Sequence, residues 1–429
     1  MRIAIVGMGI SGQGAARLAI AQGHAVSLLD AKATAPHLSG GTAYYGCDWP
    51  APSQFDRIIV SPGVPPQLPW LETARREGVE MDGELSVAAQ QIDIPILAIT
   101  GTNGKSSTAY YTHQLLVAAG KRSFLGGNFG TPLSDLVLQQ DGFDVAVVEV
   151  SSYQLEWAKV FKPSASALLN LTPDHLARHH SMEAYAACKR RIFEHCTPDQ
   201  VVITNTDARL FPADSQRHWI LGKREAPGAI IEDNYLCLKS ETEQYRIACS
   251  QLPLIGAHNY WNVAAAALLC HAFGIALSDL AVSQLKPLEH RLEPICELNG
   301  VCWVNDSKAT NVEATEAALM GVSGPQIVLL GGAGKAGASY GQLLPLLLRK
   351  ARHVICFGQS GSDIVNDISA HPNCHLVTTL EAAMQLAHRI SNSSDTVLLS
   401  PACASFDAFD NFMHRGQTFR DFALQLEAS

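Results

Sequence analysis

The chain has 429 residues, of which 47% are hydrophobic and 17% charged, a composition typical of a globular protein with more than one core. Its formal net charge of −9 argues against a general nucleic-acid or membrane-surface binder, because such proteins present a basic face. The 11 cysteines form no Cys-x-x-Cys pair, so we expect neither a disulfide framework nor a zinc ribbon. Because no apolar run reaches the roughly 18 residues of a membrane span, we interpret the protein as cytoplasmic.

The first ninety residues alternate short apolar strands with a helical pattern. We expect strands at 3–7, 25–30 and 57–63 and a helix at 11–23. Short buried strands separated by helices are typical of a parallel α/β sheet.

The turn after the first strand, "GMGISGQG", carries a dinucleotide fingerprint. Gly7, Gly9 and Gly12 match G-x-G-x-x-G, and Asp30 ends the next strand. Such glycines allow a diphosphate to approach a helix N-terminus. The pattern indicates a diphosphate and a sugar hydroxyl without specifying nicotinamide. The alternative is a tight turn without a ligand.

A second unit begins at the strand 92–101, whose loop, "ITGTNGKSST" (99–108), leads into a helix at 105–119. The usual P-loop has a glycine five positions before its Gly-Lys pair, where this chain has Ile99. Glycines still favour an anion nest, Lys105 adds charge for phosphates, and Ser106 offers a hydroxyl to Mg²⁺. The alternative is a plain turn with a solvated lysine. The loop residues considered are Gly101, Thr102, Asn103, Gly104, Lys105, Ser106 and Ser107.

Three further candidates follow in the same unit. Glu149 ends the apolar strand 144–152, where a carboxylate either holds Mg²⁺ or caps a helix. His175, with two more histidines in "NLTPDHLARHH", is a metal ligand or a loop histidine, and the spacing is not that of a zinc site. From its surroundings alone, Lys189 is expected to be a solvated helix lysine.

The rest of the chain predicts a strand at 201–207, an antiparallel patch at 223–250 and a helix at 259–274. A third α/β unit starts near residue 290, with strands at 302–306, 326–332, 353–358 and 396–400. Its "GGAGK" (331–335) repeats the G-x-x-G-K spacing but is followed by Ala336, so a second complete ATP site is not expected. The polar segment "NDSKATN" (305–311) follows a strand, where ligands bind in such sheets.

Taken in order, these segments resemble the Mur ligases, the ATP-dependent amide-forming enzymes of peptidoglycan assembly. The matching motifs are "TGTNGKSS", "EVSSYQLE", "NLTPDHLARH", "KRRIFE", "GAHNYWNVAAA", "HRLE", "NDSKATN" and "GGAGK". The segment "LSPACASFDAFDNFMHRG" (399–416) is similar to the C-terminal signature of the D-glutamate-adding members, and the D-N-P-R motif of other members is absent.

The resemblance implies three α/β domains: a Rossmann-like domain at 1–91, a central P-loop ATPase-like domain with a parallel sheet at 92–288 and a Rossmann-like domain at 289–429. It also implies a site for each reactant. The UDP-sugar contacts are Gly9, Ile10, Ser11, Asp30, Ser61, Gly63 and Asn128, although Ala31 lacks the polar side chain that the family usually has there. Besides the loop 101–107, the ATP contacts are Asn259, Asn262, Arg291 and Asp306, and those for D-glutamate are Lys308, Thr310, Lys335, Ser405 and Phe412.

The implied catalytic residues are Lys105, Glu149, His175 and Lys189, and the implied Mg²⁺ ligands are Ser106, Glu149, His175 and a carbamylated Lys189. The implied reaction joins D-glutamate to UDP-N-acetylmuramoyl-L-alanine through an acyl phosphate, in a monomer without a nucleic-acid partner. Alternatives are a Mur-type or folylpolyglutamate-type ligase with another acceptor, an NAD-dependent oxidoreductase and a P-loop switch. The oxidoreductase leaves Lys105 and Glu149 unused.

Overall fold

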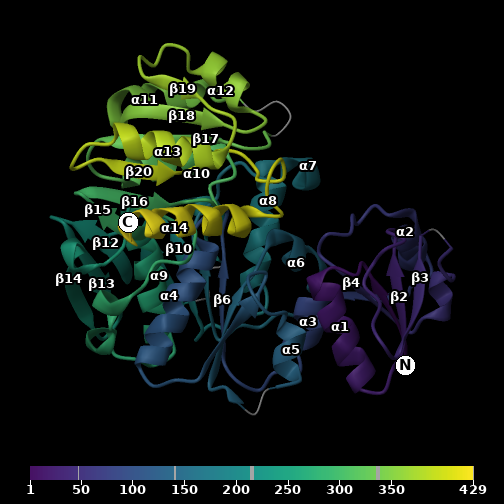
Figure 1. The fold of residues 1–429 in the computed structure, drawn as a ribbon. Helices are drawn as coiled ribbons and strands as arrows, with labels where there is room; N and C mark the ends of the chain where they lie inside the picture. The colour runs from purple at the N-terminus through teal and green to yellow at the C-terminus, as the bar shows by residue number, and fades with distance from the viewer. Residues whose placement is uncertain (47, 140–141, 213–216, 335–338, 429) are drawn as a thin grey trace. The chain divides into compact units, whose positions relative to one another are not determined.

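The chain forms three α/β sheets, seen in a computed structural model that describes residues 1–46, 48–139, 142–212, 217–334 and 339–428. The sheets have five, nine and six strands and are mainly parallel, which confirms the predicted fold class (Figure 1). The chain divides into two compact units, Met1–Leu252 with Trp261–Leu285, and Pro253–Tyr260 with Lys286–Ser429. The first unit contains the first two sheets. The domain limits 1–91, 92–288 and 289–429 stay a prediction.

The first sheet is entirely parallel, in the order β3-β2-β1-β4-β5. Its central strand, "RIAIV", is buried after the first residue, as expected for a strand covered on both faces. The order reverses beside β1, which is where parallel sheets bind ligands. Its elements are β1 (Arg2–Val6), α1 (Ile10–Ala21), β2 (Ala25–Asp30), β3 (Gly41–Tyr45), β4 (Arg57–Val60), α2 (Pro69–Arg76), β5 (Glu80–Gly83) and α3 (Glu84–Ala89).

The second sheet has the order β14-β13-β12-β11-β10-β9-β6-β8-β7. Strands β6 to β12 run parallel, whereas β13 and β14 pair antiparallel, which confirms the antiparallel patch expected at 223–250. The strands β6 and β8 are buried along their whole length. Its elements are β6 (Ile96–Thr100), α4 (Lys105–Ala118), β7 (Ser123–Gly127), α5 (Leu133–Val137), β8 (Val145–Glu149), α6 (Ser152–Trp157), β9 (Ala165–Leu168), α7 (Leu176–His179), α8 (Met182–Arg190), β10 (Val201–Asn205), β11 (Arg217–Leu221), β12 (Gly228–Glu232), β13 (Tyr235–Lys239) and β14 (Gln244–Ala248).

The helix expected at 259–274 is α9 (Ala257–Ala272), which begins and ends two residues earlier than predicted. Alanine and leucine fill its middle, and these side chains are fully buried. No helix in the described part of the chain has both the length and the apolar content needed to cross a bilayer. The cysteines in the same part are free thiols.

The third sheet has the order β15-β16-β20-β17-β18-β19, and only the β15–β16 pair is antiparallel. Alternate side chains of β17 enter two cores, with Val328 on one face and Ile327 on the other. Its elements are β15 (Glu293–Leu298), β16 (Val301–Asn305), α10 (Val312–Gly321), β17 (Gln326–Gly331), α11 (Leu344–Lys350), β18 (Ala351–Phe357), α12 (Gly361–Asp367), β19 (Cys374–Leu376), α13 (Leu380–Ile390), β20 (Thr396–Leu399) and α14 (Phe412–Ala428).

Within the first unit, a buried glutamate joins α3 to α5. Glu84 Oε1 accepts hydrogen bonds from the backbone nitrogen and the hydroxyl of Ser134, both at 2.7 Å. Its Oε2 is buried and has no hydrogen-bond partner among the described residues. The next residue of α5, Asp135, accepts two hydrogen bonds from Arg17 of α1. Elements of the first sheet therefore hold the start of α5.

Burial raises the pKa of the Glu84 carboxyl, and the hydrogen bonds from Ser134 only partly oppose this effect. A raised folded-state pKa means that the carboxyl contributes most stability while protonated. That stability falls as pH rises above the ordinary glutamate pKa of 4.5.

Glu84→Gln should therefore be more stable than the wild type at pH 8, because glutamine keeps an acceptor for Ser134 without burying a charge. The advantage should shrink as pH falls toward 4.5. Urea unfolding at several pH values measures it, with the exposed Glu72→Gln as a control that should show no such trend. A lower stability of Glu84→Gln at pH 8 would contradict the assignment.

Candidate nucleotide and ligation site

The predicted phosphate loop connects β6 to α4, as expected. Gly104 precedes the helix at φ 82°, in the left-handed region that favours glycine. A Cβ atom at Gly104 would lie 2.4 Å from Oδ1 of Asn262, so a larger residue does not fit. The loop therefore leads directly into a 14-residue helix. The backbone amides and the dipole at the start of this helix favour an anion.

Two lysine side chains meet on this loop. Lys105 Nζ donates to the carbonyl oxygens of Gly101 (3.0 Å) and Thr102 (2.9 Å). Lys189 Nζ, from α8, donates to the same Gly101 oxygen at 2.8 Å. Two residues far apart in sequence therefore place cationic groups on one carbonyl, next to the predicted phosphate site.

The surroundings of Lys189 contradict the expectation of a solvated lysine. Its side chain is 1% exposed and its Nζ lies 4.6 Å from the centre of the Tyr185 ring. Burial first, and then the neighbouring charge of Lys105, lower the pKa of Lys189 to about 7, while Glu149 acts in the opposite direction. Residue type and spacing do not reveal this burial, because it depends on the contact between α8 and the folded loop.

Glu149 lies at the end of β8, paired with Ile99 of β6, and is 2% exposed. Its Oε1 accepts a hydrogen bond from Asn128 Nδ2 at 2.6 Å, so these two predicted residues meet. Its Oε2 is buried without a hydrogen-bond partner in the described part of the chain. The next helix, α6, has its own capping box from Ser151 and Gln154, which contradicts the capping alternative for Glu149.

His175 is half-exposed and sits at the start of α7 with φ 53°. Its Nδ1 lies 3.2 Å from the Tyr153 hydroxyl, and Nε2 lies 3.5 Å from Asp174. The nearby His179 instead is buried and contacts Ser152 through Nε2. Within the described residues, no three His, Cys, Asp or Glu side chains form a group that could hold a metal. The zinc alternative therefore gains no support.

Asn170 is a loop residue that the sequence interpretation missed. It follows β9, and its Oδ1 accepts hydrogen bonds from the backbone nitrogens of Thr102 (3.1 Å) and Asn103 (2.8 Å). Its Nδ2 donates to the Asn103 carbonyl at 3.0 Å. The available signal was a polar residue directly after the apolar run "SALL", at the same sheet edge as the phosphate loop.

The glycine turn of the first sheet also has the expected geometry. A Cβ atom at Gly12 would lie 1.9 Å from the Gly7 carbonyl oxygen, which accepts a hydrogen bond from Ser61 at 2.6 Å. Asp30 accepts one from Met8 N at 2.7 Å, so this carboxylate braces the turn. The other predicted residues here are Gly9, Ile10 and Ser11 at the start of α1, where Ile10 is 70% exposed, and the exposed Gly63 after β4.

In the second unit, Asp306 is buried after β16 and accepts hydrogen bonds from Leu292 N and Ser400 Oγ. Burial raises its pKa to about 7, opposed by these hydrogen bonds and by Arg291. Asn259 belongs to the same unit and donates to Ile255 O at 2.7 Å. Asn262, Lys105 and Glu149 belong to the first unit.

The residues predicted for the acceptor amino acid also lie in the second unit. Lys308 Nζ sits 3.8 Å from the centre of the Phe412 ring, so two of these residues are brought together. Thr310 follows β16, and Ser405 is buried after β20. Lys335 lies outside the described residues.

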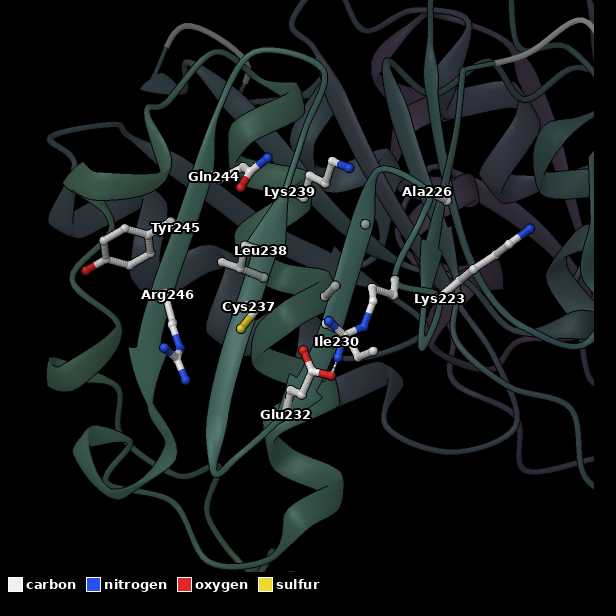
Figure 2. A pocket seen from close by; sticks show the side chains of 13 residues that line it. Lys223, Ala226, Ile230, Glu232, Cys237, Leu238, Lys239, Gln244, Tyr245 and Arg246 are labelled. Carbon is white, nitrogen blue, oxygen red and sulfur yellow. Dashed lines mark ion pairs between the residues drawn. The ribbon is translucent and has the colours of Figure 1, made fainter.

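A separate depression of about 330 Å³ lies on β12–β14, lined in part by Lys223, Lys239 and Arg246 (Figure 2). Arg224 in its wall is ion-paired with Glu232. None of the predicted site residues lines it.

Asn170→Ala should weaken ATP binding at least tenfold, because three hydrogen bonds that hold the loop are lost at roughly 0.5–1.5 kcal/mol each. Calorimetric titration with ATP measures the change. The exposed Asn234→Ala, in the turn before β13, is the control and should bind as the wild type does. Unchanged affinity in Asn170→Ala would contradict the role of Asn170.

Comparison with known proteins gives one consistent result along the chain. Residues 1–83 match the family described as "Mur ligase MurD-like, N-terminal domain", residues 99–270 match "Mur ligase middle domain", and residues 290–403 match "Mur ligase, glutamate ligase domain". These segments contain the glycine turn, the phosphate loop with Glu149, and the residues after β16.

Full-length relatives agree with the domain matches. The UDP-N-acetylmuramoylalanine--D-glutamate ligase of Geobacter metallireducens is 34% identical, over 97% of this chain and 96% of its own. That of Myxococcus xanthus is 37% identical, over 98% and 97%. Among solved structures, the UDP-N-acetylmuramate-alanine ligase of Thermotoga maritima has the same fold, with a TM-score of 0.60 at 17% identity over 99% of both chains. The chain belongs to the Mur ligase family.

Proposed function

We propose that this protein is the ATP-dependent ligase that adds D-glutamate to UDP-N-acetylmuramoyl-L-alanine in peptidoglycan precursor synthesis. The full-length relatives carry this activity in their names. The observation that carries the chemistry is the buried Glu149, whose Oε2 has no hydrogen-bond partner among the described residues. Its strand pairs with β6, and the loop after β6 accepts hydrogen bonds from Lys105 and Lys189. We further propose that the protein acts in the cytoplasm as a monomer.

The first step has to turn a carboxylate into an electrophile, because oxide is too poor a leaving group. The alanyl carboxylate attacks the γ-phosphorus of ATP and displaces ADP, which gives an acyl phosphate. Lys105 neutralises phosphate charge, and the loop amides at the start of α4 orient the triphosphate. In the proposed arrangement, Asn262 lines the loop and Asn259, Arg291 and Asp306 complete the nucleotide site.

The residues present fit Mg²⁺ and ATP. The unpartnered Oε2 of Glu149 and the hydroxyl of Ser106 are oxygen donors of the kind that Mg²⁺ takes, and the loop at Gly104 leaves no room for a side chain. Bound Mg²⁺ would supply charge neutralisation on the transferred phosphoryl group. His175 is the further proposed ligand from α7.

Lys189 fits this metal site only after modification, because an ammonium group repels a cation. A carbamate on Nζ would replace the positive charge by an oxygen ligand. Its burial beside Lys105 favours the neutral amine, which is the form that reacts with CO₂. We therefore propose that Lys189 is carbamylated.

The second step joins the amino acid. The amine of D-glutamate attacks the acyl carbon, and phosphate leaves. Lys308, Thr310, Lys335, Ser405 and Phe412 are the proposed contacts for this amino acid. The UDP part is proposed to bind at the glycine turn of the first sheet, with Gly9, Ile10, Ser11, Asp30, Ser61 and Gly63, while Asn128 lies near the sugar.

Phosphate release with ATP and UDP-N-acetylmuramoyl-L-alanine should require D-glutamate. In a panel with L-glutamate, L-lysine and diaminopimelate, D-glutamate alone should support turnover, which a coupled phosphate assay measures. Turnover with another amino acid would disprove the proposed acceptor. Phosphate release without any amino acid would favour a P-loop switch, and nicotinamide binding would favour an oxidoreductase.

Lys105→Ala and Glu149→Ala should each lower kcat about 10²–10³-fold, because the first removes a charge that neutralises the phosphate and the second removes a proposed Mg²⁺ ligand. Steady-state phosphate release measures this loss. The exposed Lys121→Ala and Glu183→Ala are matched controls and should keep wild-type rates. Near-normal kcat in either site variant would contradict its role.

Removal of CO₂ should lower activity, and added bicarbonate should restore it, because a carbamate is reversible. With ¹³C-bicarbonate, the wild type should show a carbamate carbon signal by NMR that is absent in Lys189→Ala. A protein that is fully active without CO₂ and gives no such signal would contradict the modification.

A further inference from the structure

Arg415, in the first turns of α14, is a fully buried arginine that is bound only by neutral oxygens. Its side chain is 0% exposed. The guanidinium donates five hydrogen bonds of 2.8–3.3 Å, to Ser307 Oγ and O and to the carbonyls of Gly331, Cys403 and Ala404. The described residues contain no carboxylate that is ion-paired with it. Because guanidinium has five N–H donors, the hydrogen-bonding capacity of this side chain is used in full.

The acceptors lie at or just after the ends of three strands, at one edge of the third sheet. Ser307 follows β16, Gly331 ends β17, and Cys403 and Ala404 follow β20, which lies between those two strands. A planar fork can hold three loops in one arrangement, whereas lysine offers a single flexible ammonium. The packing is tight, since a Cβ atom at Gly332 would lie 2.9 Å from Arg415 Nη1.

The segments after β16 and β20 carry residues proposed to contact the acceptor amino acid. Lys308 directly follows Ser307, and Ser405 directly follows Ala404. Ser307 Oγ also donates to the Phe412 carbonyl at 2.8 Å, and the Phe412 ring lies under Lys308 Nζ. Arg415 therefore binds the residues that directly precede Lys308 and Ser405 in the chain.

The charge of Arg415 has a second consequence. Burial lowers the pKa of Arg415 to about 10, so the side chain stays protonated at neutral pH. Four carbonyl dipoles and the Ser307 hydroxyl solvate this cation, and the carboxylate of Asp407 reduces the positive potential that it leaves at the nearby surface. This potential favours an acceptor with two carboxylates over one with a single carboxylate.

We propose that Arg415 is the positioning residue of the acceptor site: its fork sets the arrangement of the loops after β16, β17 and β20, and its charge favours a dicarboxylate amino acid. This inference rests on the proposed function. It adds a residue that need not touch the substrate.

Arg415→Lys tests the proposal, because it keeps the charge and loses the fork. The KM for D-glutamate should rise about tenfold or more. Single-turnover ADP formation from ATP and UDP-N-acetylmuramoyl-L-alanine, without D-glutamate, should stay within about twofold of the wild type. Arg415→Met should raise this KM further, since it removes the charge as well.

Arg420→Lys is the matched control. Arg420 lies on the same helix but pairs with the carboxylates of Glu289 and Glu293, which a lysine also satisfies. Its KM for D-glutamate should stay within about twofold of the wild type. An unchanged KM in Arg415→Lys, or an equal loss in ADP formation and in the use of D-glutamate, would overturn the proposal.

If Arg415→Lys does not fold, Ser307→Ala decides, because it removes one acceptor of the fork. A KM for D-glutamate raised about threefold, with ADP formation retained, would support the proposal, and an unchanged KM would overturn it. Turnover of the wild-type protein with the amino-acid panel tells a failure of this proposal apart from a failure of the proposed function. If another amino acid alone supports turnover, the proposed acceptor is wrong, and the same variants are then measured with that amino acid.

Discussion

The carbonyl oxygen of Gly101 accepts hydrogen bonds from both Lys105 and Lys189, and the arrangement of the phosphate loop depends on this shared acceptor. Lys189 is buried, and the ammonium group of Lys105 on the same oxygen repels its charge. It is therefore the group whose pKa is lowered, to about 7. The same carbonyl oxygen thus holds two lysines in different surroundings, and only Lys189 is nine-tenths or more buried.

The same sheet edge holds the other first-unit residues that lie around the phosphate loop. Asn170 after β9, the glycine loop after β6 and Glu149 at the end of β8 come from three neighbouring strands. Parallel strands bring their carboxyl ends together, so residues up to about seventy positions apart in the sequence become neighbours. Asn170 ties the loop backbone, while Asn128 orients Glu149 and leaves its second oxygen available.

In the third sheet, a buried arginine connects the segments at the ends of neighbouring strands. Arg415 and Lys189 are both buried cations, but the five hydrogen bonds of Arg415 go to four carbonyls and the Ser307 hydroxyl, and Arg415 retains its charge. Lys189 has one hydrogen bond and a close cation, and its charge is easily lost. The ordinary pKa of arginine, 12.5, is also higher than that of lysine, 10.5, so burial leaves Arg415 charged but brings the pKa of Lys189 to about 7.

The sequence by itself determined the fold class, the succession of three α/β units along the chain and the position of the phosphate loop. Periodicity and glycine spacing are local, so "ILAITGTNGKSS" already predicts strand, loop and helix. The family resemblance implied the proposed role of Lys189, which its local sequence alone predicts to be a solvated lysine.

Only the tertiary structure decided burial and partnership. The burial of Lys189, the ties of Asn170 to the loop, the unpartnered oxygen of Glu149 and the five acceptors of Arg415 all depend on contacts between segments far apart in the chain. Hydrogen bonding and desolvation are properties of the folded surroundings, and no local pattern of residues encodes them.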